Sequence, residues 1–188
     1  MTFDLVKSLA IETVTSPATA ARRLLSIAVP GQALVLGVVL LAVLNGLYYA
    51  LLLPGLAQAG LVAPSIAEAP FLVTAFIFAV FAVMIVLTSK AGQFLGGTGD
   101  LERIAQITVW LQALRFAGQV AIALISFASP AISWLLSTAI GLWGIWILLN
   151  FIAEAHGFTV PKAIGTLVMT FFGMVLIMSI LSVVFGLT

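Results

Sequence analysis

The chain has 188 residues, of which 63% are hydrophobic and only 7% are charged; seven basic and six acidic side chains leave a net charge of +1. Soluble domains carry roughly 25% charged residues, so this composition excludes a soluble enzyme, an intrinsically disordered chain and a nucleic-acid binder with a basic face. The sequence contains no cysteine, which excludes disulfides, thiolate metal sites and a cysteine nucleophile.

The first 28 residues are predicted to form a leader of two short amphipathic helices on the cytoplasmic side. Asp4 and Glu12 interrupt the apolar core that a signal peptide would need. The second helix is expected to begin with Ser16 as N-cap and Pro17 at its first position, and Arg22 and Arg23 on its polar face are predicted to contact lipid headgroups. The leader is either a docking surface for lipid or a partner, or a simple anchor that orders the start of the first span.

Five apolar stretches are each long enough to cross a bilayer. At 1.5 Å per residue they measure about 28 to 36 Å, against a hydrocarbon core of about 30 Å. The fold class is therefore all-α: a polytopic bundle of five transmembrane helices forming one membrane domain over residues 29–188. The spans are predicted at 31–53, with Leu53-Pro54-Gly55 closing the first, and at 71–89, 104–127, 131–151 and 164–187.

The basic residues predict the orientation of these spans. Six of the seven Lys and Arg residues lie in the leader or in the second and fourth loops, and the seventh, Arg115, lies inside the third span. Five crossings place all six loop residues on one side, which the positive-inside rule makes cytoplasmic. We therefore expect a multi-pass protein of the bacterial inner membrane with its N-terminus in the cytoplasm and its C-terminus outside.

Polar residues share one face of the third span. Thr108, Gln112, Arg115 and Gln119 are spaced by four, three and four residues, so this face is unsuited to lipid and needs neighbouring helices to cover it. Asn45 of the first span lies at a similar depth and is a candidate partner of Arg115. The row is either a polar path or binding pocket, or a set of interhelical hydrogen bonds around an arginine that snorkels to the interface.

A second polar cluster lies at the cytoplasmic end of the fourth span. Asn150 and Glu154 share a helical face, and His156 follows. Glu154 is expected to pair with Arg103 or Lys162 and so to fix how the last three spans meet. One His and one Glu without cysteine do not match a recognised metal-ligand spacing, so no metal is predicted.

The glycine-rich run Gly96-Gly97-Thr98-Gly99-Asp100 joins the second and third spans. It lacks the Lys-Ser/Thr of a phosphate-binding loop, so we interpret it as a flexible turn in which Thr98 or Asp100 caps the next helix. The sequence contains no His-Glu-x-x-His, no Gly-x-Ser-x-Gly and no pair of membrane carboxylates. We therefore predict no enzymatic activity and no cofactor.

These segments resemble bacterial members of the Yip (Ypt-interacting protein) family. The likeness rests on the run from Gly96 to Glu102 leading into Trp110-Leu111-Gln112, and on the run from Phe151 to Phe158, and it extends from about Ser16 to Thr188. It implies a five-helix membrane protein without known catalytic residues. Eukaryotic relatives sit in Golgi and endoplasmic reticulum membranes and associate with small Rab-type GTPases, but their Asp-Leu-Tyr-Gly-Pro leader motif is absent here, which argues against a small GTPase partner.

The favoured function is a membrane scaffold or adaptor, or a bilayer-organising protein. Its expected partners are membrane lipids and a second copy of the chain or another membrane protein, with no nucleic acid. The alternative is a small oligomeric transporter or channel that attracts a polar or anionic solute to Arg115. A lipid-binding or lipid-handling protein is a further alternative.

Overall fold

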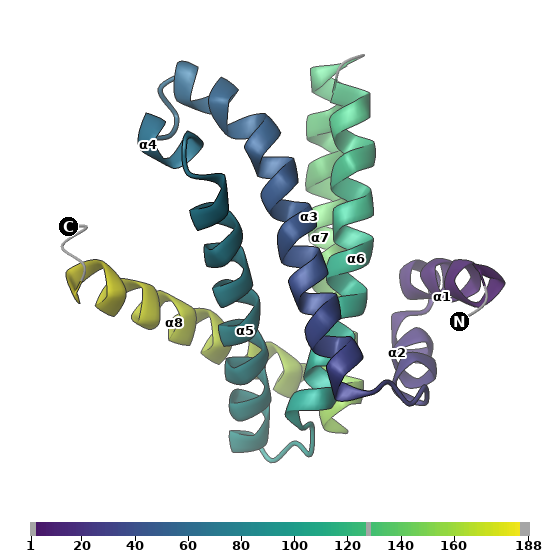
Figure 1. The fold of residues 1–188 in the computed structure, drawn as a ribbon. Helices are drawn as coiled ribbons and strands as arrows, with labels where there is room; N and C mark the ends of the chain where they lie inside the picture. Colours follow the sequence, from purple (N-terminus) through teal and green to yellow (C-terminus); the bar gives the residue numbers. More distant parts are fainter. Residues whose placement is uncertain (1–2, 127–128, 185–188) are drawn as a thin grey trace.

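The computed structural model, which describes residues 3–126 and 129–184, confirms the all-helical fold: no strand occurs in these two segments (Figure 1). Five helices are long and apolar enough to cross a membrane, as predicted. In chain order the helices are α1 (Phe3–Thr15), α2 (Pro17–Leu25), α3 (Gly31–Gln58), α4 (Pro64–Ala67), α5 (Pro70–Phe94), α6 (Leu101–Ser126), α7 (Pro130–His156) and α8 (Val160–Val184).

The long helices extend beyond most of the predicted spans. The first was expected to end at Leu53-Pro54-Gly55, but α3 continues through Pro54 to Gln58. Proline is tolerated inside a membrane helix because neighbouring groups can satisfy the carbonyl that it frees, whereas the sequence rule that it ends a helix holds best in water. The short helix α4 was not predicted. The predicted ends at residues 127 and 187 lie outside the described segments.

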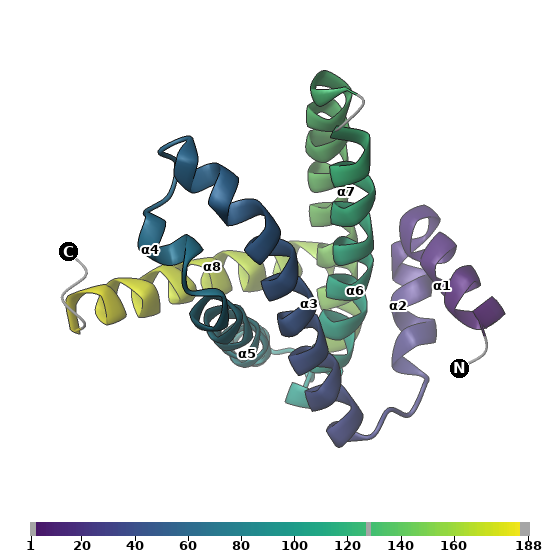
Figure 2. The same cartoon turned by 45° about the horizontal axis from the view of Figure 1, so that its top comes forward.

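The five long helices pack around a ring. α3 packs against α5 and α6, α6 packs against α7, and α8 closes the ring by packing against both α5 and α7. Figures 1 and 2 show that α3, α6 and α7 run roughly side by side, whereas α8 crosses obliquely and moves away from α6 and α7 along its length. The leader helices α1 and α2 lie outside the ring, against the flank formed by α6 and α7.

The tightest packing is at one end of this ring, which we call the charged end. It comprises the starts of α3, α6 and α8, the ends of α5 and α7, and the loops between them. The fully buried side chains there include Ile104, Ile107, Phe151, Ile152 and His156. By contrast, most of the first half of α7 is exposed, so the helices are held together mainly at the charged end.

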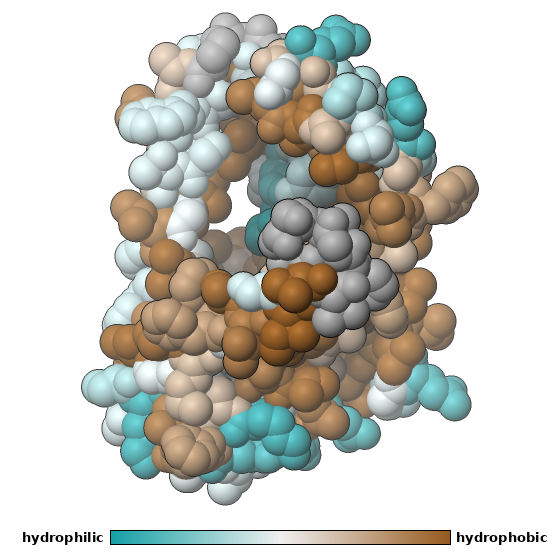
Figure 3. Space-filling model, turned by 90° about the vertical axis from the view of Figure 1, so that its left-hand side faces the viewer, coloured by the Kyte–Doolittle hydropathy of each residue, from teal (hydrophilic) through white to brown (hydrophobic). Residues whose placement is uncertain are grey.

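Polar side chains at the two ends flank an apolar middle. Figure 3 shows a largely hydrophobic band between two more hydrophilic ends. Lys90, Arg103 and Lys162 are exposed at the charged end, whereas the loop between α3 and α5 at the opposite end, which we call the loop end, contains one charged residue, Glu68. This distribution matches a helical bundle that spans a bilayer.

Candidate functional site

The leader is held against α6 by a buried glutamine. The side-chain nitrogen Nε2 of Gln106 donates hydrogen bonds to the main-chain carbonyls of Leu24 at 2.8 Å and Ile27 at 2.9 Å. These carbonyls belong to the C-terminal end of α2 and the segment after it, and the Leu24 carbonyl also accepts from the N–H of Ile27 at 3.0 Å. Gln106 therefore fixes the end of α2 to the bundle.

Two tryptophans hold the C-terminal end of α1. The indole Nε1 of Trp110 on α6 donates to the hydroxyl of Thr13, and that of Trp143 on α7 donates to the carbonyl of Val14, both at 3.0 Å. Indole N–H groups are donors only and need an acceptor in an apolar environment. Neither partner could be predicted from the sequence, because the acceptors lie about 100 to 130 positions away along the chain.

Two ion pairs involve the leader arginines. Arg22 pairs with Glu154 on α7 at 2.6 Å, and Arg23 pairs with Glu12 on α1 at 3.1 Å. The expected pairing of Glu154 with Arg103 or Lys162 is therefore wrong. Because α2 packs against α7, Arg22 is the basic residue that pairs with the Glu154 carboxylate. The Arg22 side chain stays 59% exposed, and the contact of both arginines with lipid headgroups remains a prediction.

The Arg22–Glu154 pair should contribute little to stability. Exposed ion pairs are worth about 0 to 1 kcal/mol because water and salt screen them. We expect Arg22→Gln to lower the free energy of unfolding by less than about 1 kcal/mol, with a loss that shrinks further in high salt. Thermal unfolding at two salt concentrations measures this, and Lys90→Gln on the exposed end of α5 is the charge-matched control. A large loss that is independent of salt would contradict the assignment.

His156 forms the centre of the charged end. Three glycines surround its imidazole ring: Gly92 of α5, with Gly97 and Gly99 of the following loop. A Cβ atom at Gly92 would overlap the ring, and one at Gly97 or Gly99 would lie 2.7 Å from it, closer than real contacts allow. We call these three residues the glycine cradle. The ring of Phe158 stacks on the imidazole with centroids 5.1 Å apart.

Hydrogen bonds join His156 to the same loop. The imidazole Nδ1 accepts from the main-chain N–H of Gly99 at 3.1 Å, and the His156 carbonyl accepts from the N–H of Thr98 at 2.9 Å. Since Nδ1 is the acceptor, the neutral ring carries its proton on Nε2. The glycine-rich run was interpreted as a flexible turn; instead, its glycines allow the loop backbone to approach a buried histidine.

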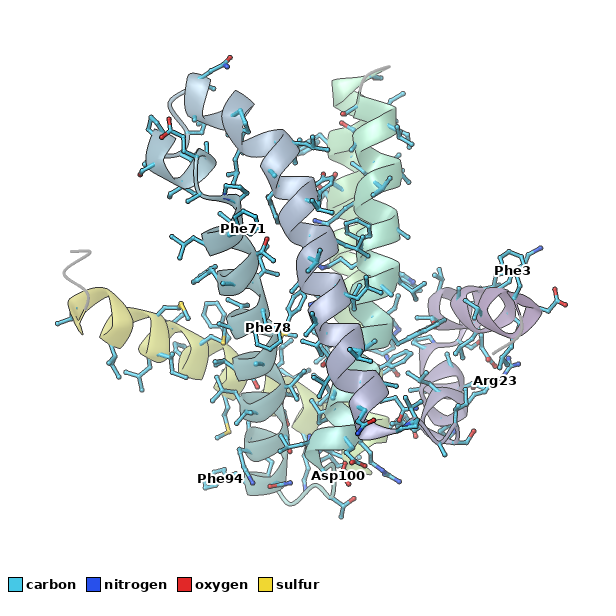
Figure 4. The ribbon with its side chains drawn as sticks, viewed as in Figure 1. Phe3, Arg23, Phe71, Phe78, Phe94 and Asp100 are labelled. Carbon is cyan, nitrogen blue, oxygen red and sulfur yellow. The ribbon has the colours of Figure 1, made fainter. Side chains whose placement is uncertain are left out.

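The loop is braced further from α5 and α6. The side chains of Ser89 and Gln93 both donate to the carbonyl of Gly99, at 3.3 and 3.0 Å. The carboxylate of Asp100 accepts from the N–H of Arg103 at 2.8 Å, which confirms the expectation that Asp100 caps the third span. Figure 4 shows Asp100 and Phe94 at this end of the bundle. The polar groups of the loop are therefore used to position it.

Comparison with known families decides the affiliation. The family profile of the Yip1 domain matches residues 11–184. The chain belongs to the Yip1 family. No curated protein and no solved structure matched this chain. The resemblance seen in the sequence is thus confirmed, and the match covers the last five residues of α1, all of α2 and all five long helices.

Both segments that carried the Yip resemblance meet at His156. Gly97 and Gly99 come from the first segment, and His156 and Phe158 from the second. Asn150, predicted in the same cluster, instead bonds within its own helix, donating to the carbonyl of Trp146 at 2.8 Å. No hydrogen bond or ion pair among residues 3–126 and 129–184 joins the Arg103 side chain to Glu154. The predicted cluster is therefore divided between the leader contact and the cradle.

A pocket of about 450 Å³ lies beside the cradle in the Yip1 domain. It opens between the segment that links α2 to α3 and the start of α6. Its polar lining comes from Asp100, Glu102, Arg103 and Gln106, and Pro30 and Leu34 contribute apolar lining. In the described part of the chain no group of three or more His, Asp and Glu residues is placed to hold a metal ion. The pocket offers charges of both signs on a surface shaped by the leader.

The intramembrane polar row was predicted to contact Asn45, and it does. The Nη2 of Arg115 donates to the side-chain oxygen of Asn45 at 3.3 Å, and its Nε donates to Gln112 on the same helix. Asn45 is fully buried and also donates to the carbonyl of Leu41. Thr108 is buried, whereas Arg115 is exposed. The row therefore contributes one interhelical hydrogen bond, from an Arg115 side chain whose residue stays exposed.

Proposed function

We propose that this Yip1-family protein is a non-enzymatic membrane scaffold that presents its charged end to a protein partner. The observation that carries the proposal is the docking of the leader against α6 and α7 and of the glycine-rich loop against His156 at the end of α7. Gln106, Trp110 and Trp143 fix the leader, and His156 fixes the loop. Surface elements held in one geometry lose less conformational entropy on binding, which favours recognition.

The exposed charges of this end support the same proposal. Lys90, Arg103 and Lys162 are exposed around the cradle, as are Asp100 and Glu102 beside the pocket. Polar side chains elsewhere in the domain mostly bond to their own or a neighbouring helix. A mixed-charge rim around a partly apolar pocket suits a protein partner, because charge complementarity selects the partner and apolar burial stabilises the complex.

We propose further that the charged end faces the cytoplasm of a bacterial inner membrane. All Lys and Arg residues except Arg115 lie in the leader or at this end, and cytoplasmic loops carry such an excess of basic residues. In that orientation the end of the leader, which joins α3 at Gly31, would lie on the same side as the α5–α6 and α7–α8 loops. The partner would then be a cytoplasmic or membrane-associated protein.

Site-specific photo-crosslinking in native membranes tests the scaffold proposal. A crosslinking amino acid at Lys90, Arg103 or Lys162 should give the same discrete protein adduct, and the adduct should be lost when Arg103→Glu reverses a charge beside the pocket. Positions Leu51 and Phe71, exposed near the loop end, are the matched controls and should not give that adduct.

Two results would count against this function. Adducts that are equally abundant from Leu51 and Phe71 would show that the charged end has no special role. An adduct of twice the mass of the chain as the sole product would replace a partner protein with a second copy. Either result is visible on the same denaturing gel and identified by mass spectrometry of the adduct.

A further inference from the structure

Arg115 lies deep in the membrane domain without an opposite charge. It is 14 residues after the start of α6 and 11 before its end, which is about 21 and 16 Å by helical rise. None of the ion pairs formed within residues 3–126 and 129–184 includes it. Its hydrogen bonds go to the neutral amides of Asn45 and Gln112. An intramembrane guanidinium costs several kcal/mol to insert and calls for a compensating anion.

The exposed side of Arg115 faces the inside of the helix ring. Gln106, nine residues earlier, contacts the leader on the outside of the ring. Nine residues at about 100° each place Arg115 on the opposite face of α6. Gln119 lies one turn beyond Arg115 on that face, and its Oε1 is buried without a hydrogen-bond partner. The face therefore carries an unpaired charge beside an unpaired acceptor, and both could be satisfied by one ligand.

The ring has an opening on this side. Figure 3 shows a hollow in the upper half of the view, with hydrophilic surface at its floor and both pale and hydrophobic atoms around it. The hollow is viewed from the side of α5 and α8, and the oblique course of α8 in Figures 1 and 2 leaves the ring open toward the loop end. Because the helices around this opening are long and apolar enough to cross a membrane, a ligand that enters it from the side comes from the lipid phase.

We propose that the hollow binds the acidic headgroup of a membrane amphiphile, with its phosphate or carboxylate oxygens paired to the guanidinium of Arg115. Arginine presents paired N–H groups that match two oxygens of a phosphate or carboxylate. Gln119 Oε1 would accept a hydrogen bond from a hydroxyl of the same headgroup. The acyl chains would leave through the lateral opening into the bilayer. The headgroup of the lipid would thus pair with Arg115, and its chains would contact the apolar surfaces of the surrounding helices.

Lipid retention by the purified full-length protein tests the proposal. Native mass spectrometry and thermal unfolding are followed while phosphatidylglycerol, or phosphatidylcholine with the same chains, is added. Phosphatidylglycerol should be retained and should raise the unfolding temperature more than phosphatidylcholine. Arg115→Gln should weaken phosphatidylglycerol binding by about ten- to a hundredfold, the usual loss for a charge-assisted hydrogen bond.

Control variants separate the site from general charge and folding effects. Lys7→Gln removes the same charge from the exposed surface of α1 and should leave lipid affinity unchanged. Gln119→Leu keeps Arg115 and should weaken binding by about two- to tenfold, as for a neutral hydrogen bond, so the site remains testable if Arg115→Gln fails to fold. Equal retention by wild type and the folded Arg115→Gln or Gln119→Leu variant would overturn the proposal.

A second arm distinguishes a lipid from a dissolved anion. Inorganic phosphate at millimolar concentration should neither displace phosphatidylglycerol nor raise the unfolding temperature of the lipid-free protein. If phosphate protects as well as the lipid does, and Arg115→Gln removes that protection, the site takes an aqueous oxyanion and the amphiphile assignment is wrong. None of these results depends on the crosslinking outcome at the charged end.

Discussion

Replacing Gly92 by alanine should destabilise the membrane domain by about 1 to 3 kcal/mol or more, the usual cost of overpacking. The added Cβ overlaps the imidazole of His156, which is itself enclosed by the loop and by Phe158 and has little room to move. Because Gly92 is helical, alanine fits the backbone and the cost comes from the clash alone. Thermal unfolding in detergent micelles measures the loss.

A matched control and a rescue isolate the clash. Gly118 is also a helical glycine, but a Cβ there meets nothing within 4 Å, so Gly118→Ala should be neutral or slightly stabilising. In a His156→Ala background the Gly92→Ala change should cost little, giving a large coupling between the two positions. If the losses of unfolding free energy are additive in this double-mutant cycle, the contact with His156 is not the reason why Gly92→Ala destabilises the protein.

Replacing Gln106 by methionine should release the leader. Methionine has a similar length but donates no hydrogen bond, so the carbonyl of Ile27 loses its side-chain donor while it stays part-buried. Leaving a buried acceptor without a partner costs about 1 to 3 kcal/mol. Because that loss falls on the contact between the leader and α6, trypsin should cleave after Arg22 and Arg23 several-fold faster, as measured by the rate of appearance of the shortened chain.

Gln32→Met is the control for this experiment. Gln32 is exposed in the first turn of α3, so its replacement should change neither the cleavage rate nor the unfolding temperature. Trp110→Phe, which removes only the indole donor to Thr13, should accelerate cleavage in the same direction by a smaller factor. Unchanged cleavage in Gln106→Met would mean that apolar packing of α2 alone retains the leader.

Length and hydropathy were enough to predict the helical fold. Twenty or so consecutive apolar residues have few options in a bilayer except to form a helix, since only a helix satisfies every main-chain group within the segment. The leader helices followed from their amphipathic pattern and from Ser16-Pro17, and Asp100 from its place before the third span. The end of α3 was wrong because Pro54 stops helices less strictly in lipid than in water.

The contacts of the candidate site were less accessible from the sequence. Asn45 was correctly matched to Arg115 because both are rare polar residues at similar depth. The partner of Glu154 was predicted wrongly, because depth in the membrane does not show which of several basic residues at one end lies closest to the carboxylate. The docking of α2 against α7 brings Arg22 to Glu154. The role of Gly92, Gly97 and Gly99 depends on a histidine some 60 residues later, a relation that no local pattern contains.

The uneven charge of the two ends also bears on how the chain is made. Suppose that α3 and α5 enter the bilayer as one helical hairpin, and α6 and α7 as another. The connecting segment of the first hairpin, which has to cross the bilayer, then contains a single charged residue, Glu68. The connecting segment of the second hairpin, residues 127–129, contains no charged residue. In the orientation proposed above, every basic loop would stay on the side of synthesis. Arg115 is the one basic residue that has to enter the hydrocarbon region itself, and inserting an arginine at a helix centre costs about 2.5 to 3.5 kcal/mol. We therefore expect the insertion of α6 to depend on contacts with neighbouring helices more than that of any other span.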